Sequence, residues 1–169
     1  MRRLFQVPFV FVQARMNILL SIFFSPRPRG VIDMPATVSK WLCRKGYTAI
    51  TLFGRIYTRE QVEADKLNST LGALKNHEMI HLRQAQNTCN SWLVFYFLYM
   101  WHSMLALRYF RKTRNAAYYL NPFEIEAYVH MYDLHYLERF GKKGADGWRA
   151  FAGMSLAARL RFIRQNGIG

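Results

Sequence analysis

The pentapeptide HEMIH at residues 77–81 constrains the fold of this chain more than any other stretch. Side chains four residues apart on a helix lie on the same face, one turn apart. His77 and His81 would therefore direct their imidazole rings at a common point, with Glu78 beside them. Two imidazoles at this spacing can bind Zn²⁺, and the glutamate between them can act on a water molecule at the metal. The alternative is a pair of histidines on a helix surface with a solvated glutamate.

Residues 70–87 are predicted to form the helix that carries this pentapeptide. Ser69 or Thr70 is a suitable N-cap, because a short hydroxyl side chain accepts a hydrogen bond from the first helical turn. The helix is expected to end near residues 87–90, where polar side chains cluster.

The segment before this helix contains the clearest β pattern of the chain. Residues 47–58 are rich in β-branched and aromatic side chains and alternate like a strand, with a bend or turn at Gly54. Residues 59–67 are polar and are expected to form a turn that leads into the helix. The sequence therefore predicts a small β-hairpin or short sheet ahead of the pentapeptide.

Residues 92–107 form an apolar run that is rich in aromatic side chains and is followed by Arg108, Arg111, Lys112 and Arg114. A helix that spans a bilayer needs about 18 or more apolar residues, and this run is shorter. Aromatic side chains with a basic flank are typical of a helix at a membrane interface. The run is predicted to form a helix that is buried, re-entrant or parallel to the membrane surface.

Another helix is predicted over residues 122–140, with Asn121 as its N-cap and a proline at its first position. Glu124, Ala127 and Tyr128 share one face of this helix, because they are three and four residues apart. The small side chain of Ala127 lets that face approach another helix closely. Glu124 is therefore the best candidate for the third protein ligand that a catalytic zinc site needs.

Glu124 also has a structural alternative at this position. As the third helical residue after Asn121, it could close a capping box onto the backbone N–H of that residue. Glu126 faces away from the Glu124 side of the helix, and we keep Glu126 and His130 as reserve ligands.

The remainder of the chain is predicted to be mainly helical, which makes the fold α+β and mainly α. Residues 148–165 are predicted to form one amphipathic helix, after a basic, glycine-rich loop at residues 141–147. We divide the chain into a basic, apolar N-terminal arm and linker at residues 1–30 and one domain at residues 31–169. The apolar helix forms an insertion in that domain, at about residues 91–110.

The charge of the chain predicts an acidic partner. The 169 residues include 24 Lys and Arg against 10 Asp and Glu, for a net charge of +14. Aromatic residues at 16% favour an anionic membrane surface over nucleic acid, for which no recognition motif is present. The two cysteines form no CxxC motif, which excludes a disulfide framework and a thiolate zinc cluster. We expect a cytoplasmic protein, peripheral on the inner face of a membrane.

The residues HEMIH at 77–81, followed by Glu124-x-x-Ala127, resemble the short form of the gluzincin pattern (HExxH…ExxA) of zinc metallopeptidases. The segments LFGRIY at 52–57 and PFEIEAY at 122–128 are similar to those of small, largely uncharacterised zincin-like proteins. The resemblance covers about residues 45–137, and it implies a zincin-like fold.

The resemblance implies a role for each matching residue. His77, His81 and Glu124 would bind one Zn²⁺, and Glu78 would be the general base that deprotonates the zinc-bound water. The strand at residues 50–57 would be the edge along which a peptide substrate adds as a further strand. The implied function is hydrolysis of a peptide or related amide bond, and the alternative is a catalytically idle zincin-like or basic membrane-associated interaction domain.

The sequence departs from the gluzincin pattern at Tyr128, where larger gluzincins more often carry an aspartate that orients the first zinc histidine. A tyrosine brings no negative charge, so the basicity of that ligand is expected to be lower. The candidates for a hydrogen bond to a zinc ligand, or to the oxyanion formed from the substrate, are Tyr128, Tyr119 and Tyr118, which we do not rank. A metal site also constrains the apolar run, because a single membrane crossing at residues 92–107 would separate Glu124 from the two histidines.

Overall fold

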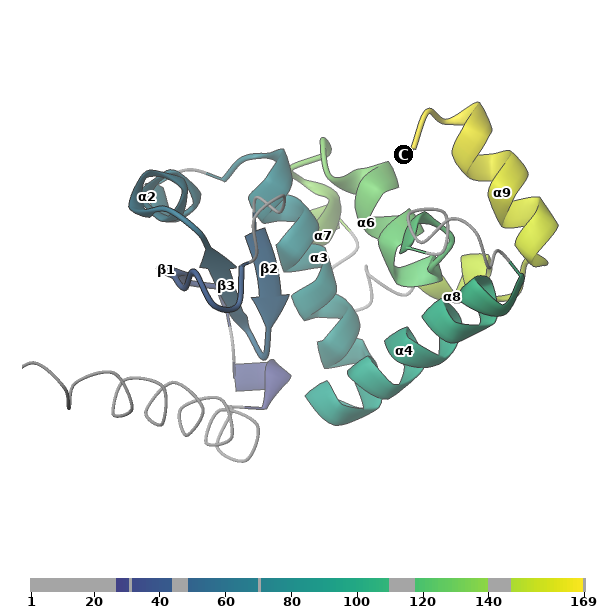
Figure 1. Cartoon of the computed structure of the whole chain (residues 1–169), viewed down its shortest axis with the longest axis horizontal. Helices are drawn as coiled ribbons and strands as arrows, with labels where there is room; N and C mark the ends of the chain where they lie inside the picture. The colour runs from purple at the N-terminus through teal and green to yellow at the C-terminus, as the bar shows by residue number, and fades with distance from the viewer. Residues whose placement is uncertain are drawn as a thin grey trace, which may run out of the picture.

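The computed structural model of the chain describes residues 27–30, 32–43, 49–69, 71–109, 118–139 and 147–168. Most of the predicted N-terminal arm and of the glycine-rich loop at residues 141–147 lies outside these ranges. The described part is mainly helical with a three-stranded sheet, which confirms the predicted α+β, mainly α class (Figure 1).

The sheet consists of β1 (Ala36–Val38), β2 (Ala49–Leu52) and β3 (Arg55–Thr58) in the order β1-β3-β2. β2 and β3 form an antiparallel hairpin whose turn residues, Phe53 and Gly54, have positive φ angles of 49° and 78°. The hairpin and its turn at Gly54 agree with the prediction. β1 pairs in parallel with β3 and was not predicted, because three residues are too few to show an alternating pattern.

The polar residues that were expected to form a turn instead form helix α2 (Gln61–Ser69). The side chain of Gln61 donates a hydrogen bond to Asp65 Oδ1 at 2.7 Å, one helical turn later. Ala64 and Leu67 are buried against the sheet side of the helix. The prediction of a turn was wrong because only two buried apolar residues, Ala64 and Leu67, mark the inner face of α2, and two positions give a weak periodic signal.

Helices α3 (Ala73–Asn87) and α4 (Trp92–Tyr109) confirm the two central helices of the prediction. α3 begins later than expected, with Gly72 as its N-cap. Of the two predicted caps, Ser69 is the last residue of α2, and Thr70 lies outside the described residues. Figure 1 shows α3 between the sheet and α6, with α4 leading away from its C-terminal end. The connecting turn passes through Cys89 and Asn90, which both have positive φ angles. None of the helices in the described ranges is both long enough and apolar enough to cross a membrane.

The helix predicted over residues 122–140 is interrupted, which corrects the prediction. α6 (Pro122–His130) ends where the buried side chain of Asn76 on α3 donates to backbone carbonyls. The Nδ2 atom of Asn76 lies 3.0–3.2 Å from the backbone oxygens of His130, Met131 and Asp133. These contacts hold the chain in a turn before the short helix α7 (Tyr136–Arg139).

The predicted C-terminal helix is also two helices, α8 (Trp148–Ala152) and α9 (Leu156–Gln165). Ser155 starts α9, because its Oγ accepts a hydrogen bond from Ala158 N at 3.2 Å. Arg159 of α9 is buried. Its guanidinium donates hydrogen bonds to the backbone oxygens of Leu120, Phe151 and Ala152.

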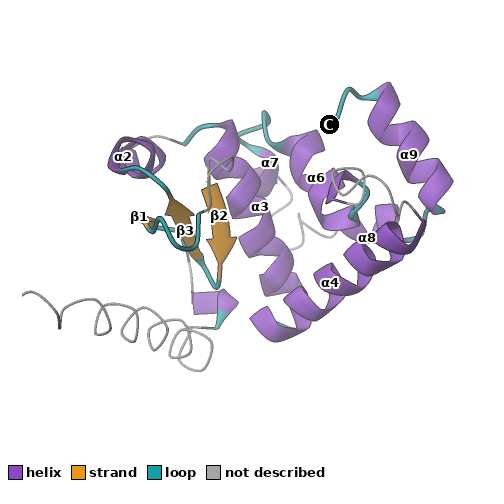
Figure 2. Ribbon diagram, in the orientation of Figure 1, coloured by secondary structure: helices purple, strands orange, loops and turns teal. Residues whose placement is uncertain are grey.

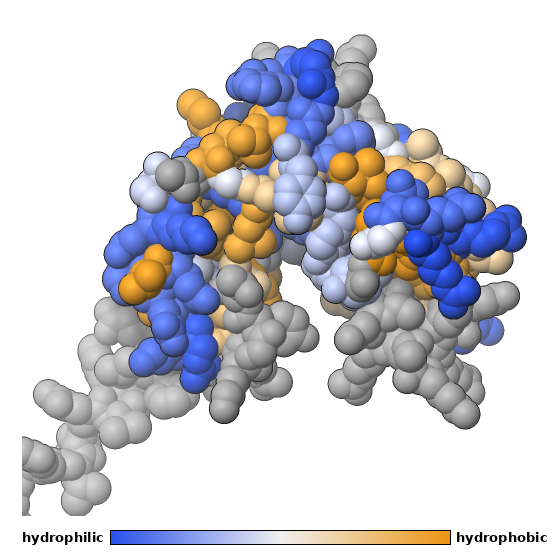
Figure 3. All heavy atoms as spheres, turned by 90° about the horizontal axis from the view of Figure 1, so that it is seen from above, coloured by the Kyte–Doolittle hydropathy of each residue, from blue (hydrophilic) through white to orange (hydrophobic). Residues whose placement is uncertain are grey.

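The main hydrophobic core extends from α2 and the sheet across α3 to α4, α6 and α8, and Figure 2 shows the arrangement of these elements. Phe123 at the start of α6 is fully buried, with its ring stacked on Trp148 at 4.3 Å between centroids. The ring of Phe95 on α4 meets Phe123 edge-on at 5.1 Å. α6 therefore enters the core through its first turn, which also carries Glu124. Elsewhere apolar side chains reach the surface, and Figure 3 shows them among hydrophilic ones on one face of the molecule.

Candidate metal centre

Helix α3 places the two histidines of the pentapeptide as its periodicity predicts. The imidazole rings of His77 and His81 lie edge to face, with centroids 4.8 Å apart. Their Nε2 atoms are 3.1 Å apart, and both side chains are buried. The two Nε2 atoms therefore converge on one small volume inside the protein rather than facing solvent.

Helix α6 brings Glu124 to the same point. Its Oε2 lies 3.3 Å from His77 Nε2, and its Oε1 lies 3.4 Å from His81 Nε2. The capping alternative is not realised, because Asn121 caps α6 with its own side chain and gives its backbone N–H to Tyr118 O. The Glu124 carboxylate is thus free to face the histidines.

The geometry of this group fits a metal ion. Ligand atoms at about 2.0–2.1 Å from a tetrahedral ion are about 3.3–3.4 Å apart. Here the two Nε2 atoms are 3.1 Å apart, and each lies 3.3 or 3.4 Å from a different oxygen of Glu124. With one ligand atom taken from each residue, all three lie within 4.8 Å of one another. Glu124 Oε2 is also a buried oxygen that accepts no hydrogen bond within the described residues. His77, His81 and Glu124 therefore form a group that could hold a metal ion.

The charges of the group favour a cation at this position. Burial would lower the pKa of His81, but the neighbouring Glu124 carboxylate raises that pKa to about 9. Burial would likewise raise the pKa of Glu124, but the imidazoles of His81 and His77 hold it well below its usual range. Without metal, the centre is an imidazolium paired with a carboxylate. A divalent cation would take the place of the proton on His81.

Gln84, one turn after His81, sets the orientation of the second imidazole. His81 Nδ1 lies 2.7 Å from Gln84 Oε1, an acceptor, so Nδ1 carries a proton and Nε2 faces the metal group. Gln84 Nε2 in turn donates to Phe123 O at 3.0 Å and to Glu126 Oε2 at 2.9 Å. No role for Gln84 was predicted from the sequence.

The two reserve ligands lie outside the metal group. Glu126 is fully buried and accepts hydrogen bonds from Gln84, Tyr136 Oη at 2.8 Å and Trp148 N at 2.9 Å. Burial raises the pKa of this carboxyl group. His130 stacks on the ring of Tyr136, 3.9 Å away, at the end of α6. Glu126 thus supports the histidine indirectly, through Gln84.

Tyr99 on the apolar helix α4 contacts the centre and was not identified from the sequence. Its hydroxyl donates a hydrogen bond to Glu124 Oε1 at 2.7 Å. Burial and the Glu124 carboxylate both raise the pKa of Tyr99, so the hydroxyl stays protonated and remains a donor. The apolar pattern around it indicated a packed or membrane-associated helix and gave no sign of a polar contact.

Glu78 lies beside the metal group but is not part of it. Its Oε2 accepts a hydrogen bond from Thr51 Oγ1 at 2.5 Å, which ties it to β2. Glu78 is a buried residue, 8% exposed. The hairpin therefore fixes the position of the glutamate that the pentapeptide contributes.

The tyrosine candidates gather around His77 and Glu124. The ring of Tyr128 meets His77 edge-on at 4.7 Å, and the ring of Tyr119 lies 5.4 Å from Tyr128. Burial and the Glu124 carboxylate raise the pKa of Tyr118 far above its usual range. Tyr128 contacts the first histidine through its ring. Tyr118 lies close to the Glu124 carboxylate, and Tyr119 contacts the rings of Tyr118 and Tyr128.

Comparisons with protein-family models, with curated proteins and with solved structures give no match for this chain. The resemblance to gluzincins therefore rests on the pattern of the pentapeptide and Glu124. The class of site that the geometry supports is a buried group of two histidines and one glutamate that could hold a metal ion.

Proposed function

We propose that this protein is a zinc-dependent hydrolase of the metallopeptidase type, which cleaves a peptide or related amide bond. The observation that carries the proposal is the convergence of His77, His81 and Glu124, with Glu78 next to the first histidine. Two imidazoles and one carboxylate are a ligand set of catalytic zinc sites, and they leave a fourth position open.

Each side chain of the site has a role in this proposal. Bound Zn²⁺ would supply a Lewis acid that lowers the pKa of a water molecule. Glu78 would accept a proton at its Oε1, since Thr51 already occupies Oε2. The hydroxyl of one of the three candidates, Tyr118, Tyr119 or Tyr128, would donate to the oxygen of the substrate carbonyl group.

Strand β2 offers a place for the substrate backbone. It is an outer strand in the order β1-β3-β2, and its Thr51 is the residue that holds Glu78. A peptide that added alongside β2 would bring its carbonyl groups close to the base. This arrangement supports an extended peptide as the substrate.

The burial of the site supports the rival proposal of a zinc-binding domain without catalytic activity. The side chains of His77, His81 and Glu124 are only 5%, 9% and 4% exposed. A substrate would need the surrounding tyrosines to move before it reached the metal. In the rival proposal, the metal stabilises the packing of α3 against α6.

Substitution of Glu78 separates the two proposals. We expect the purified protein to contain one zinc per chain by elemental analysis, and His81→Ala to lose it. Glu78→Gln should retain the zinc but lower cleavage of a peptide library by at least about a hundredfold, because it removes the base. Glu60→Gln, on an exposed glutamate, should change neither property. A Glu78→Gln protein with unchanged cleavage would refute the catalytic proposal, and zinc without any cleavage would favour the idle domain.

A further inference from the structure

Helix α4 has an apolar face that the described part of the protein leaves open. The side chains of this outer face recur every three or four residues and are 51–68% exposed; they are Leu93, Phe97, Met100, Trp101 and Met104. Such spacing places them in one stripe along the helix. Over 18 residues, the helix is about 27 Å long, so the stripe is long and continuous.

The opposite face of α4 is already occupied by the protein. Trp92, Phe95 and Ala106 are buried on it, and Tyr99 donates its hydrogen bond to Glu124. The backbone oxygen of Tyr99 also accepts a hydrogen bond from Asn121 Nδ2 at 3.0 Å. α4 is therefore held to the protein along its length, and a partner would meet the outer face only.

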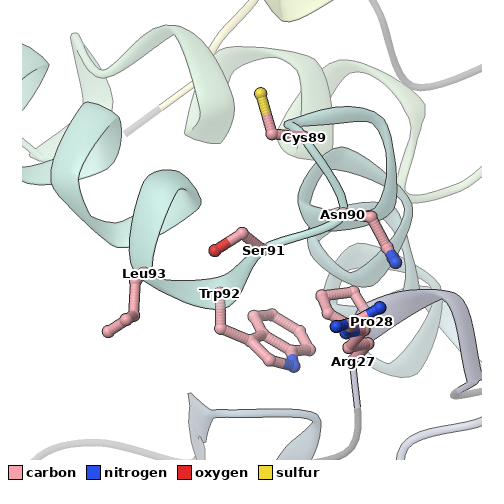
Figure 4. A pocket seen from close by; sticks show the side chains of 7 residues that line it. All are labelled: Arg27, Pro28, Cys89, Asn90, Ser91, Trp92 and Leu93. Atoms are coloured by element: carbon pink, nitrogen blue, oxygen red, sulfur yellow. The ribbon is translucent and has the colours of Figure 1, made fainter.

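The charges around this face are basic. The sequence contains no acidic residue between Glu78 and Glu124, a stretch that includes all of α4. Arg108 stands exposed in the last turn of α4. At the other end of α4, Arg27 and Leu93 line the same pocket of about 360 Å³, and Figure 4 shows the side chains around it. Arg27 therefore places a basic side chain next to the first turn of α4.

We propose that the outer face of α4 binds an anionic lipid bilayer, with the helix parallel to the membrane surface. Its aromatic and methionine side chains would enter the boundary between headgroups and acyl chains, while the basic groups at its ends meet the headgroup phosphates. A second copy of the chain is disfavoured as the occupant, because each copy carries a net charge of +14. The metal centre would then lie behind the face that contacts lipid.

Vesicle binding by the full-length protein tests this proposal. We expect it to co-sediment with vesicles of phosphatidylcholine containing about one third phosphatidylglycerol, and more weakly with phosphatidylcholine alone or at high salt. The variant Phe97→Ser with Met104→Ser leaves the charge unchanged and should bind at least about tenfold more weakly, since two apolar side chains no longer enter the bilayer. The matched control is Val62→Ser, which removes an apolar side chain that is 76% exposed on α2.

Fluorescence gives a second, local readout. Trp101 lies at the centre of the outer face, so the blue shift caused by vesicles should be smaller in Trp101→Phe, although three other tryptophans remain. The proposal fails if the double variant binds anionic vesicles as tightly as the unmodified protein, which would place lipid contact elsewhere, for example in residues 1–26. It also fails if the unmodified protein self-associates but does not bind vesicles, and the double variant no longer self-associates. That result would make a second copy of the chain the occupant of the outer face. Metal content is measured separately, so the proposed membrane contact and the proposed zinc-dependent hydrolysis can each fail without the other.

Discussion

At the scale of the residue, the two nitrogens of His81 have different partners. Nε2 faces the metal group, and Nδ1 is held by Gln84, which Glu126 fixes from behind. Gln84→Leu removes the acceptor for Nδ1 and leaves the Glu126 carboxylate short of a donor. We expect zinc affinity to fall by about 10–100-fold, the usual cost of losing such an outer hydrogen bond.

Competition with a chromogenic chelator measures that affinity. Gln165→Leu is the matched control, because this glutamine lies exposed on α9, away from the centre. Equal zinc affinities in both variants would show that Gln84 does not orient His81.

The ion pair between His81 and Glu124 predicts how pH affects the metal-free protein. The pKa of His81 is raised to about 9 in the fold, against about 6.5 in the unfolded chain. The pair therefore contributes its full stability below about pH 6.5 and loses it as the pH rises through about 9. Chemical denaturation of chelator-treated protein at pH 6.5 and 9.5 should show lower stability at the higher pH. In His81→Gln this decrease should be smaller, and an unchanged decrease would assign it to other groups.

Tyr99 shows which part of the site the sequence could not provide. The histidine pair follows from helix geometry over four residues, and Glu124 follows from its face on the second helix. The contact between Tyr99 and Glu124 joins residues 25 apart in the sequence, and no local pattern encodes it. Gln84 was overlooked for a related reason, since its position beside His81 depends on a hydrogen bond to the buried carboxylate of Glu126.

At the scale of the element, Asn76 determines where α6 stops. Its buried amide donates to three backbone oxygens in the turn after His130. Asn76→Ala leaves these oxygens without that donor, and we expect it to lower the free energy of unfolding by about 2 kcal/mol. Urea denaturation measures the difference. Asn166→Ala, at the exposed end of α9, should cost less than about 0.5 kcal/mol; equal losses would contradict the role of Asn76.

Long periodic segments were predictable, and interruptions imposed by distant residues were not. α3 and α4 match their predicted ranges within a few residues, because each carries a long, consistent pattern. α6 and α7 separate under the influence of Asn76, and α9 starts anew at Ser155 with Arg159 holding the end of α8. β1 is defined by its pairing with β3, and Asn68 of α2 hydrogen-bonds both backbone groups of Ala36. In each case a contact between elements overrides the local preference.

At the scale of the whole molecule, the candidate centre joins α3 to α6, and Tyr99 connects it to α4. A metal ion bound there would hold together elements that lie far apart in the sequence. We therefore expect Zn²⁺ to raise the melting temperature, because a ligand that binds the folded state stabilises it in proportion to the logarithm of its concentration. At about 1,000 times the dissociation constant the gain is about 4 kcal/mol, or about 10 °C for a chain of this size.

Scanning calorimetry of chelator-treated protein, with and without added Zn²⁺, measures this shift in the melting temperature. Glu124→Gln keeps the shape of the side chain but removes its charge, so it should abolish most of the shift. Glu60→Gln, an exposed glutamate on another part of the chain, should preserve the shift in full. If Zn²⁺ raised the melting temperature of Glu124→Gln as much as that of the unmodified protein, the metal would bind without Glu124, and the centre as described would be wrong. A shift that depends on Glu124 would instead show that binding at this group stabilises the packing of α3 against α6.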